Sequence, residues 1–237
     1  MRRPDAHSFF EFLAREYPEW CEVIVDIGVE RDSPFLRENF PRSKHILVEC
    51  EKSYHPQIAE RYAGMDYELV YAGVGATYGN FHLFKDSIRA DGETTHTFLE
   101  TDATRAATRI AKGQTNYELI DVVPADHLYR TFRPPDRKYI TKIDIDSIEY
   151  DVIEASELLF PRSAIVMVEC PLWLKKGFAT RYWAAERKGL RLIDIVSPCY
   201  YKDRLWQVDL IFINEALAPG FHANPHPVDP SRWQGSW

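Results

Sequence analysis

Acidic residues stand at the ends of several short apolar runs in this sequence. Asp144 and Asp146 close the run over residues 139–145, and Asp26 lies at the end of another run, two residues before Gly28. A carboxylate in such a place can orient a hydroxyl, accept its proton or bind a divalent metal through oxygen. Glycine lets the backbone approach a ligand closely. Asp144 and Asp146 are therefore candidate catalytic residues and candidate ligands of a divalent metal.

Each of these carboxylates also has a purely structural interpretation. Asp146 and Glu149 fit a D-x-x-E variant of the helix capping box. Strand alternation places Lys142 and Asp144 on one face, where they could form a structural ion pair. Asp26 and Gly28 could simply order a turn.

Glu49 follows another apolar run, residues 45–48, about 20 residues after Gly28. An acidic residue at this separation is placed to accept hydrogen bonds from the ribose hydroxyls of a nucleotide-type cofactor; the alternative is a surface glutamate. Dinucleotide enzymes also need G-x-G-x-x-G for the pyrophosphate, whereas residues 28–33 read Gly-Val-Glu-Arg-Asp-Ser. Two carboxylates would repel a pyrophosphate, whereas S-adenosylmethionine has no phosphate and carries a sulfonium and an ammonium, so it tolerates them. The loop therefore favours S-adenosylmethionine over NAD.

A long polar insert, residues 87–116, interrupts the alternation of apolar runs and helical stretches. Inserts of this length are usually lids or binding loops. Residues 101–112 within it predict a short helix that Gly113 ends. His96 could close over a site as a catalytic base, although a loop histidine is more often only solvated.

The remaining pattern predicts a parallel α/β sheet. The apolar runs lie at residues 23–27, 45–48, 68–72, 139–145 and 165–168, and segments 190–196 and 207–213 predict a C-terminal antiparallel hairpin. Residues 5–17 read as an amphipathic helix within an N-terminal segment, 1–20. The tail, 219–237, has no periodicity. No internal repeat or linker divides the chain, so we expect one domain over residues 1–237.

The composition limits the partners. A net charge of −7 with scattered lysines and arginines argues against nucleic acid and fits a small-molecule or carbohydrate acceptor. No apolar run approaches the roughly 20 residues that span a bilayer, so no membrane partner is expected. Four separated cysteines and acidic residues within the first 16 positions indicate a cytoplasmic protein without a signal peptide. Assembly into a homo-oligomer is left open.

The segment around Asp144 resembles a known family. Residues 142–155 read Lys-Ile-Asp-Ile-Asp-Ser-Ile-Glu-Tyr-Asp-Val-Ile-Glu-Ala. They are similar to the hallmark of FkbM-type methyltransferases, K-I-D-V-E-G followed by x-E-x-x-V-L-x-G-A, with Asp146 for the glutamate and Ser147 for the glycine. Further segments resemble the family's V-D-V-G (25–28), F-E-P (48–50, with Cys50 for proline), glycine-rich hairpin (72–84), the segment leading to T-L-D-x-L (122–128) and V-E (168–169). The similarity covers about residues 20–215.

The resemblance implies a class I, Rossmann-like O-methyltransferase that uses S-adenosyl-L-methionine. Its fold would be a mostly parallel seven-stranded sheet with helices on both faces and a C-terminal antiparallel hairpin. It also implies the cofactor contacts, which would be Asp26 and Gly28 at the methionine end, Glu49 at the ribose, and Ala72 and Gly73 beside the adenine, with Cys50 as a further cofactor-binding residue.

The chain departs from the family in its first loop. The family usually reads G-A-N-x-G there, and this chain lacks both the asparagine and the second glycine. A non-catalytic methyltransferase-like binding or scaffold domain is therefore one alternative. A nucleotide-cofactor oxidoreductase is another, disfavoured by the missing G-x-G-x-x-G.

Overall fold

The fold is described from a computed structural model of the chain. The structure describes residues 5–86, 96–136, 138–146, 148–174, 177–219 and 221, and His96 by its backbone alone. Part of the insert and most of the tail predicted above lie outside these residues.

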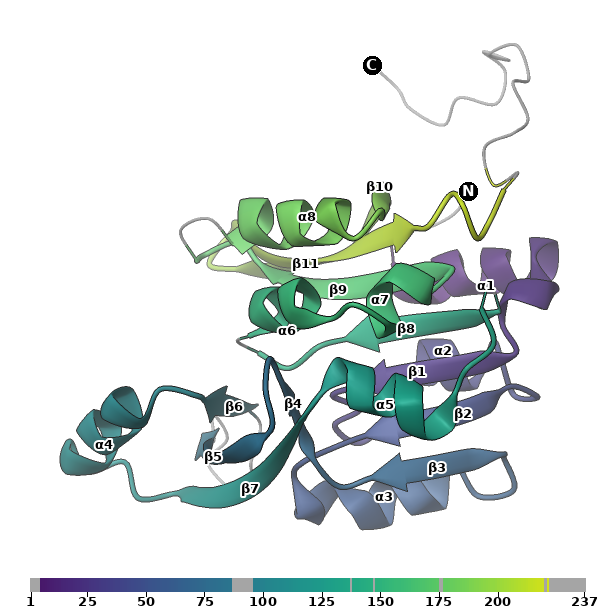
Figure 1. Ribbon diagram of the computed structural model, residues 1–237. Coiled ribbons are helices and arrows are strands. Elements are labelled where there is room, and N and C mark those ends of the chain that lie inside the picture. The colour runs from purple at the N-terminus through teal and green to yellow at the C-terminus, as the bar shows by residue number, and fades with distance from the viewer. Residues whose placement is uncertain are drawn as a thin grey trace.

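The main sheet has seven strands in the order β10-β11-β9-β8-β1-β2-β3. Five of them run parallel, and β11 and β10 complete the sheet antiparallel (Figure 1). The predicted mostly parallel, seven-stranded sheet with its C-terminal hairpin is confirmed. The strands are β1 (Val23–Ile27), β2 (Lys44–Val48), β3 (Tyr67–Val70), β8 (Tyr139–Ile143), β9 (Ile165–Pro171), β10 (Arg191–Tyr201) and β11 (Arg204–Ile213).

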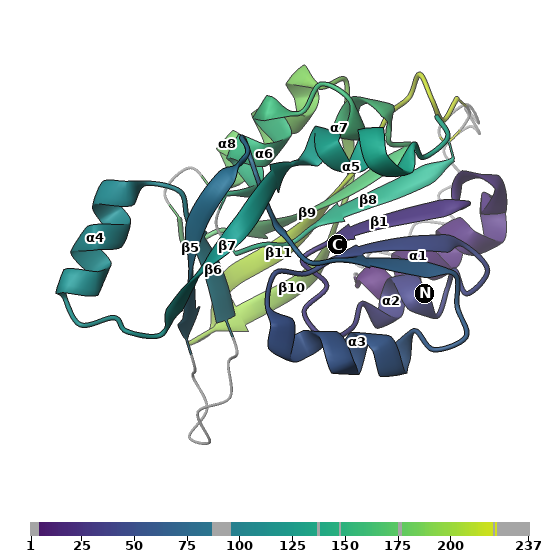
Figure 2. The ribbon, with the colours of Figure 1, turned by 60° about the horizontal axis from the view of Figure 1, so that its bottom comes forward.

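Helices cover both faces of this sheet, as predicted (Figure 1 and Figure 2). Along β1, Val25 packs in the core beneath one set of helices and Ile24 in the core beneath the other. Burial of both faces explains why this strand reads as a continuous apolar run. One layer holds α1 (Ala6–Glu16), α2 (Pro34–Arg37) and α3 (His55–Arg61), and the other holds α5 (Ala125–Phe132), α6 (Glu149–Ala155), α7 (Leu159–Arg162) and α8 (Gly177–Arg187).

The helix predicted over residues 5–17 is α1. The Asp5 side chain caps it by accepting the backbone N–H of Ser8 at 2.7 Å. Phe9, Phe10 and Leu13 are buried on its inner side. Short 3₁₀ turns follow α1 (η1, Pro18–Trp20) and precede α3 (η2, Lys52–Tyr54). Within the part of the chain that is described, no helix has the length and apolar composition to cross a membrane.

A second, four-stranded sheet was not predicted. Its order is β4-β7-β5-β6, and β4 pairs parallel with β7 while β5 pairs antiparallel with β7 and β6. The strands are β4 (Gly73–Gly75), β5 (Gly79–Asp86), β6 (His96–Glu100) and β7 (Tyr117–Pro124). The helix predicted at residues 101–112 is α4 (Ala103–Ala111), which Gly113 follows at φ +92°.

Several strand boundaries differ from the prediction, and the end of β8 matters most for the site. The run over residues 139–145 is a strand only to Ile143, where β8 ends. The backbone then leaves the sheet, and Asp146 adopts a left-handed φ of +63°. Asp144 and Asp146 therefore lie on the turn that follows β8, above the edge of the sheet.

Candidate functional site

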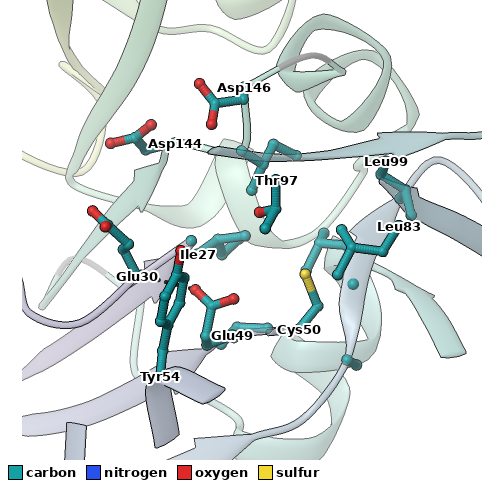
Figure 3. Close-up of a pocket in the computed structure, with 16 residues that line it drawn as sticks. Ile27, Glu30, Glu49, Cys50, Tyr54, Leu83, Thr97, Leu99, Asp144 and Asp146 are labelled. Atoms are coloured by element: carbon teal, nitrogen blue, oxygen red, sulfur yellow. Dashed lines mark hydrogen bonds between the residues drawn. The ribbon is translucent and has the colours of Figure 1, made fainter. Parts of the chain in front are cut away.

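A cleft lies at the carboxyl ends of β1, β2 and β8, where open α/β sheets bind their ligands. The second sheet closes its other side, with Leu83 from β5 and Thr97 and Leu99 from β6. The enclosed volume of the cleft is about 110 Å³, and the cleft continues from there into open solvent. Figure 3 shows that its carboxylates and its apolar side chains lie largely on different sides.

The structure brings most of the predicted site residues together in this cleft. Its wall includes Gly28, Glu49, Cys50, Ala72, Gly73, Asp144 and Asp146. Asp26 is not part of the wall, because it is fully buried behind it. His96 lies in β6 and pairs with Asp86, and its side chain lies outside the described residues. Its catalytic role stays a prediction.

Gly28 is required by a close approach of two strand ends. Its backbone has φ +80°, and its N–H donates to the carbonyl of Val48 at 2.9 Å. A Cβ on Gly28 would lie 1.7 Å from the carbonyl oxygen of Asp144. The absence of a side chain therefore lets the turn after β1 pack directly against the turn after β8, which carries Asp144 and Asp146.

The altered first loop is well supported by this chain's own contacts. Glu30, at the asparagine position of the resemblance, has a left-handed φ of +56°, a conformation in which asparagine is enriched. Its N–H donates to Glu49 at 2.8 Å. Asp32, at the position of the second glycine, accepts hydrogen bonds from Arg37 at 2.9 and 3.0 Å and from Arg61 at 3.0 Å. Of the two acids in this loop, Glu30 lines the cleft, whereas Asp32 does not.

Glu49 is buried at the bottom of the cleft. One carboxylate oxygen accepts the N–H of Glu30 and the other accepts the N–H of Glu51 at 2.7 Å. Burial raises the pKa of Glu49 to about 7, although these hydrogen bonds and the charge of Lys142 act against that rise. A ligand hydroxyl or a positive charge would stabilise the ionised form of this carboxylate, which burial disfavours.

The other side of the cleft is apolar. Ala72, Val74, Leu83 and Leu99 line it, with Cys50 at its edge. Leu83 and Leu99 belong to a small core that holds the second sheet together. Such a surface suits the flat ring of a ligand, not a charged group.

Lys142 contacts three groups beneath the site: the carboxylates of Asp26 and Asp144 and the carbonyl of Gly28. Its ammonium lies 3.1 Å from Asp26 Oδ1 and 3.5 Å from Asp144 Oδ2, and it donates to the carbonyl of Gly28 at 2.5 Å. The predicted Lys142–Asp144 pair is thus present, and Asp26 shares the same cation. Asp26 thus forms a buried ion pair with Lys142 beneath the turn, and its contact with the methionine end of a cofactor stays a prediction.

Carboxylates crowd the turn after β8. Loss of surrounding water, together with the negative charge of Asp144 and Glu149, raises the pKa of Asp146 to about 7. Burial and the charge of Asp144 likewise raise the pKa of Asp209 to about 7, and that of Glu169 well above its usual range. Several protons are therefore held or shared here near neutral pH, as in sites that move protons.

The capping box predicted for Asp146 and Glu149 does not form. The N-cap of α6 is Ile148, which provides no side-chain hydrogen bond. Glu149 is buried, accepts the N–H of Ile145 at 3.2 Å and forms an ion pair with Arg181. Asp146 is consequently available to a ligand.

No group of three or more histidine, cysteine or acidic residues within the described residues is arranged to hold a metal ion. Metal binding by Asp144 and Asp146 stays a prediction.

Comparisons with known proteins give fold-level similarities only. No model of a protein family and no curated protein matches the sequence. Among solved structures, the methyltransferase FkbM from Methylobacillus flagellatus is 14% identical with a TM-score of 0.47, over 81% of this chain and 43% of that one. This chain thus spans less than half the length of the Methylobacillus protein.

Two further solved structures contain S-adenosylmethionine. Fibrillarin from Aeropyrum pernix is 8% identical with a TM-score of 0.48, over 88% of this chain and 76% of that one. The M. jannaschii protein TYW2 is 9% identical with a TM-score of 0.44, over 90% and 78%. Identities this low do not indicate a shared substrate.

Proposed function

We propose that this protein is an S-adenosylmethionine-dependent methyltransferase that acts on a hydroxyl of a small molecule or glycan. The observation that carries the proposal is the composition of the cleft wall. Glu30, Glu49, Asp144 and Asp146 contribute four carboxylates to it, no lysine or arginine among the described residues lines it, and its other side is apolar.

This wall suits a cofactor that has a flat ring, a ribose and positive charge without phosphate. Glu49 would accept hydrogen bonds from the ribose hydroxyls, and the surface formed by Cys50, Ala72 and Val74 would hold the adenine. The carboxylates of Glu30 and Asp146 would face the cationic end. A dinucleotide would instead bring its pyrophosphate to a wall without cations, which disfavours the oxidoreductase alternative.

The bound cofactor would supply an electrophilic methyl group to an oxygen nucleophile. Asp144 lies at the open edge of the cleft, with its side chain 38% exposed. It would accept the hydrogen bond of the acceptor hydroxyl, align it and take up its proton as the oxygen is methylated. Lys142, held by Asp26, would keep Asp144 in position.

A non-catalytic scaffold is the second candidate, and the altered first loop is the observation that favours it. The test is calorimetric titration with S-adenosylmethionine and, in parallel, with NADH. We expect binding of the first only, and weaker binding by Glu49→Ala, because a charge-assisted hydrogen bond contributes about 1.5–3 kcal/mol. Glu49→Gln, which keeps one acceptor oxygen, is the matched variant and should bind with intermediate affinity. A folded protein that binds no S-adenosylmethionine would favour the scaffold.

A further inference from the structure

Three aromatic side chains form an exposed cluster at the carboxyl end of β9. Trp173 follows that strand, Tyr201 ends β10 and Trp206 lies in β11. The rings of Trp173 and Trp206 stack with centroids 5.4 Å apart and planes 18° apart, and the Tyr201 ring lies 5.1 Å from that of Trp206. Trp173 is 54% exposed and Tyr201 is 52% exposed. We call these three residues the aromatic platform.

The platform lies at the same edge of the sheet as the cleft. β9 pairs in parallel with β8, and Ile143, the last residue of β8, stands opposite Val168, so β9 extends three residues further, to Pro171, at the same edge (Figure 1). The backbone N–H of Leu172 donates to the carbonyl of Trp206 at 2.8 Å, which fixes the loop of Trp173 to β11.

A hydrogen bond connects the platform to the carboxylates at the turn. Gln207, next to Trp206, donates its side-chain amide to Glu169. Glu169 in turn contacts Asp144 through its carboxyl group. Glu169 is itself buried, so of these two carboxyl groups it is Asp144, with its side chain 38% exposed, that can meet a ligand on the platform.

The surrounding charge selects the kind of ligand. Asp144 is the partly exposed carboxylate on this side, and Lys142 is already engaged by Asp26. The ammonium of Lys202 lies 5.1 Å from the centre of the Tyr201 ring at the outer end of the platform. Carboxylates accept hydrogen bonds from hydroxyl groups and repel phosphates, whereas stacked aromatic rings bind a flat, weakly polar ring face.

We propose that the aromatic platform binds a sugar ring of the acceptor and presents one of its hydroxyls to Asp144. This inference rests on the proposed methyl transfer for its purpose, but it concerns separate residues. The weakly polar C–H face of the ring stacks on Trp173 or Tyr201, and its hydroxyls donate to the acidic side of the turn.

The test uses the full chain, labelled with ¹⁵N and loaded with S-adenosylhomocysteine. A panel of methyl glycosides (gluco, galacto, manno and fuco) is titrated while the indole N–H signals are recorded. At least one glycoside should shift the signals of Trp173 and Trp206 and leave that of Trp183 unchanged. Trp183 is the matched control, since it is also half-exposed, at 52%, but lies on α8.

Three variants extend the test. Trp173→Ala should weaken binding of that glycoside at least fivefold, Trp173→Phe should retain part of it, and Trp183→Ala should leave it unchanged. A thermal melt of each variant identifies any that fails to fold, and in that case Tyr201→Ala takes its place.

Several results would overturn the proposal. One is that no glycoside shifts the indole signals. Another is that only phenol or a sugar phosphate shifts them. A third is that the protein is a dimer and Trp173→Ala dissociates it. The two proposals fail separately. Shifted indoles without S-adenosylmethionine binding would contradict methyl transfer and retain the sugar site, whereas cofactor binding with unshifted indoles would do the opposite.

Discussion

The substitution Gly28→Ala tests whether the turn after β1 must pack directly against the turn after β8. The added Cβ would lie 1.7 Å from the Asp144 carbonyl oxygen and 2.8 Å from its carbonyl carbon, both backbone atoms. An alanine at φ +80° also carries the left-handed penalty of roughly 1–2 kcal/mol. Because the clash can be relieved only by moving the backbone of one turn, we expect a total loss of about 3–5 kcal/mol in the free energy of unfolding.

Gly64→Ala is the matched control for this prediction. Gly64 has φ +83°, and a Cβ there would meet no atom within 4 Å. It should therefore cost only the left-handed penalty, about 1–2 kcal/mol. Urea unfolding of both variants measures the difference. Equal losses in the two would refute the close-approach reasoning. Gly28→Ala should also weaken binding of S-adenosylmethionine in the fraction that stays folded, whereas Gly64→Ala should leave it unchanged.

Three further predictions follow from the charges of the site. Lys142→Met leaves Asp26 buried without its cation, so unfolding should cost about 3–5 kcal/mol less, and adding Asp26→Asn should recover part of that loss in a denaturant titration. Asp144→Asn should lower the rate of methyl transfer by roughly 100-fold at unchanged cofactor affinity. Asp146→Ser should stay active if Asp146 binds no metal, and should lose activity in a way that added divalent ions change if it does. Glu49 and Asp146 have pKa values raised to about 7, so the folded chain keeps protons that the unfolded chain has lost. Their contribution to stability should therefore fall between about pH 4.5 and pH 7, whereas affinity for the cationic cofactor should rise about tenfold from pH 6 to pH 8 by calorimetry; a flat profile would contradict this assignment.

The sequence predicted those elements whose burial leaves a simple pattern. β1 and β2 are apolar on both faces, and their predicted bounds agree with the structure to within one residue. The second sheet left no such signal, because its strands are partly polar and β4 finds its parallel partner in β7, more than 40 residues away. Non-local pairing of short polar strands cannot be read from local periodicity.

The candidate site was predictable where it depends on strand ends. Gly28, Glu49 and Asp144 follow β1, β2 and β8, and topology alone brings them to one edge. Thr97 and Leu99 were missed, because they reach the cleft from the second sheet.

The surroundings of the remaining residues depend on partners that are distant in the sequence. Asp26 turned from a wall residue into the buried partner of Lys142. Arg181, which lies 32 residues beyond Glu149, removed the expected cap. Partners so distant in sequence leave no local pattern to read.

The central claim is that the cleft between β1, β2 and the second sheet binds S-adenosylmethionine. A crystal structure with S-adenosylhomocysteine tests it most directly. The account predicts the ribose hydroxyls within hydrogen-bonding distance of Glu49, the adenine against Cys50 and Val74, and the sulfur on the side of Asp144. A ligand bound elsewhere, or a cleft that stays empty at saturating concentration, would contradict it.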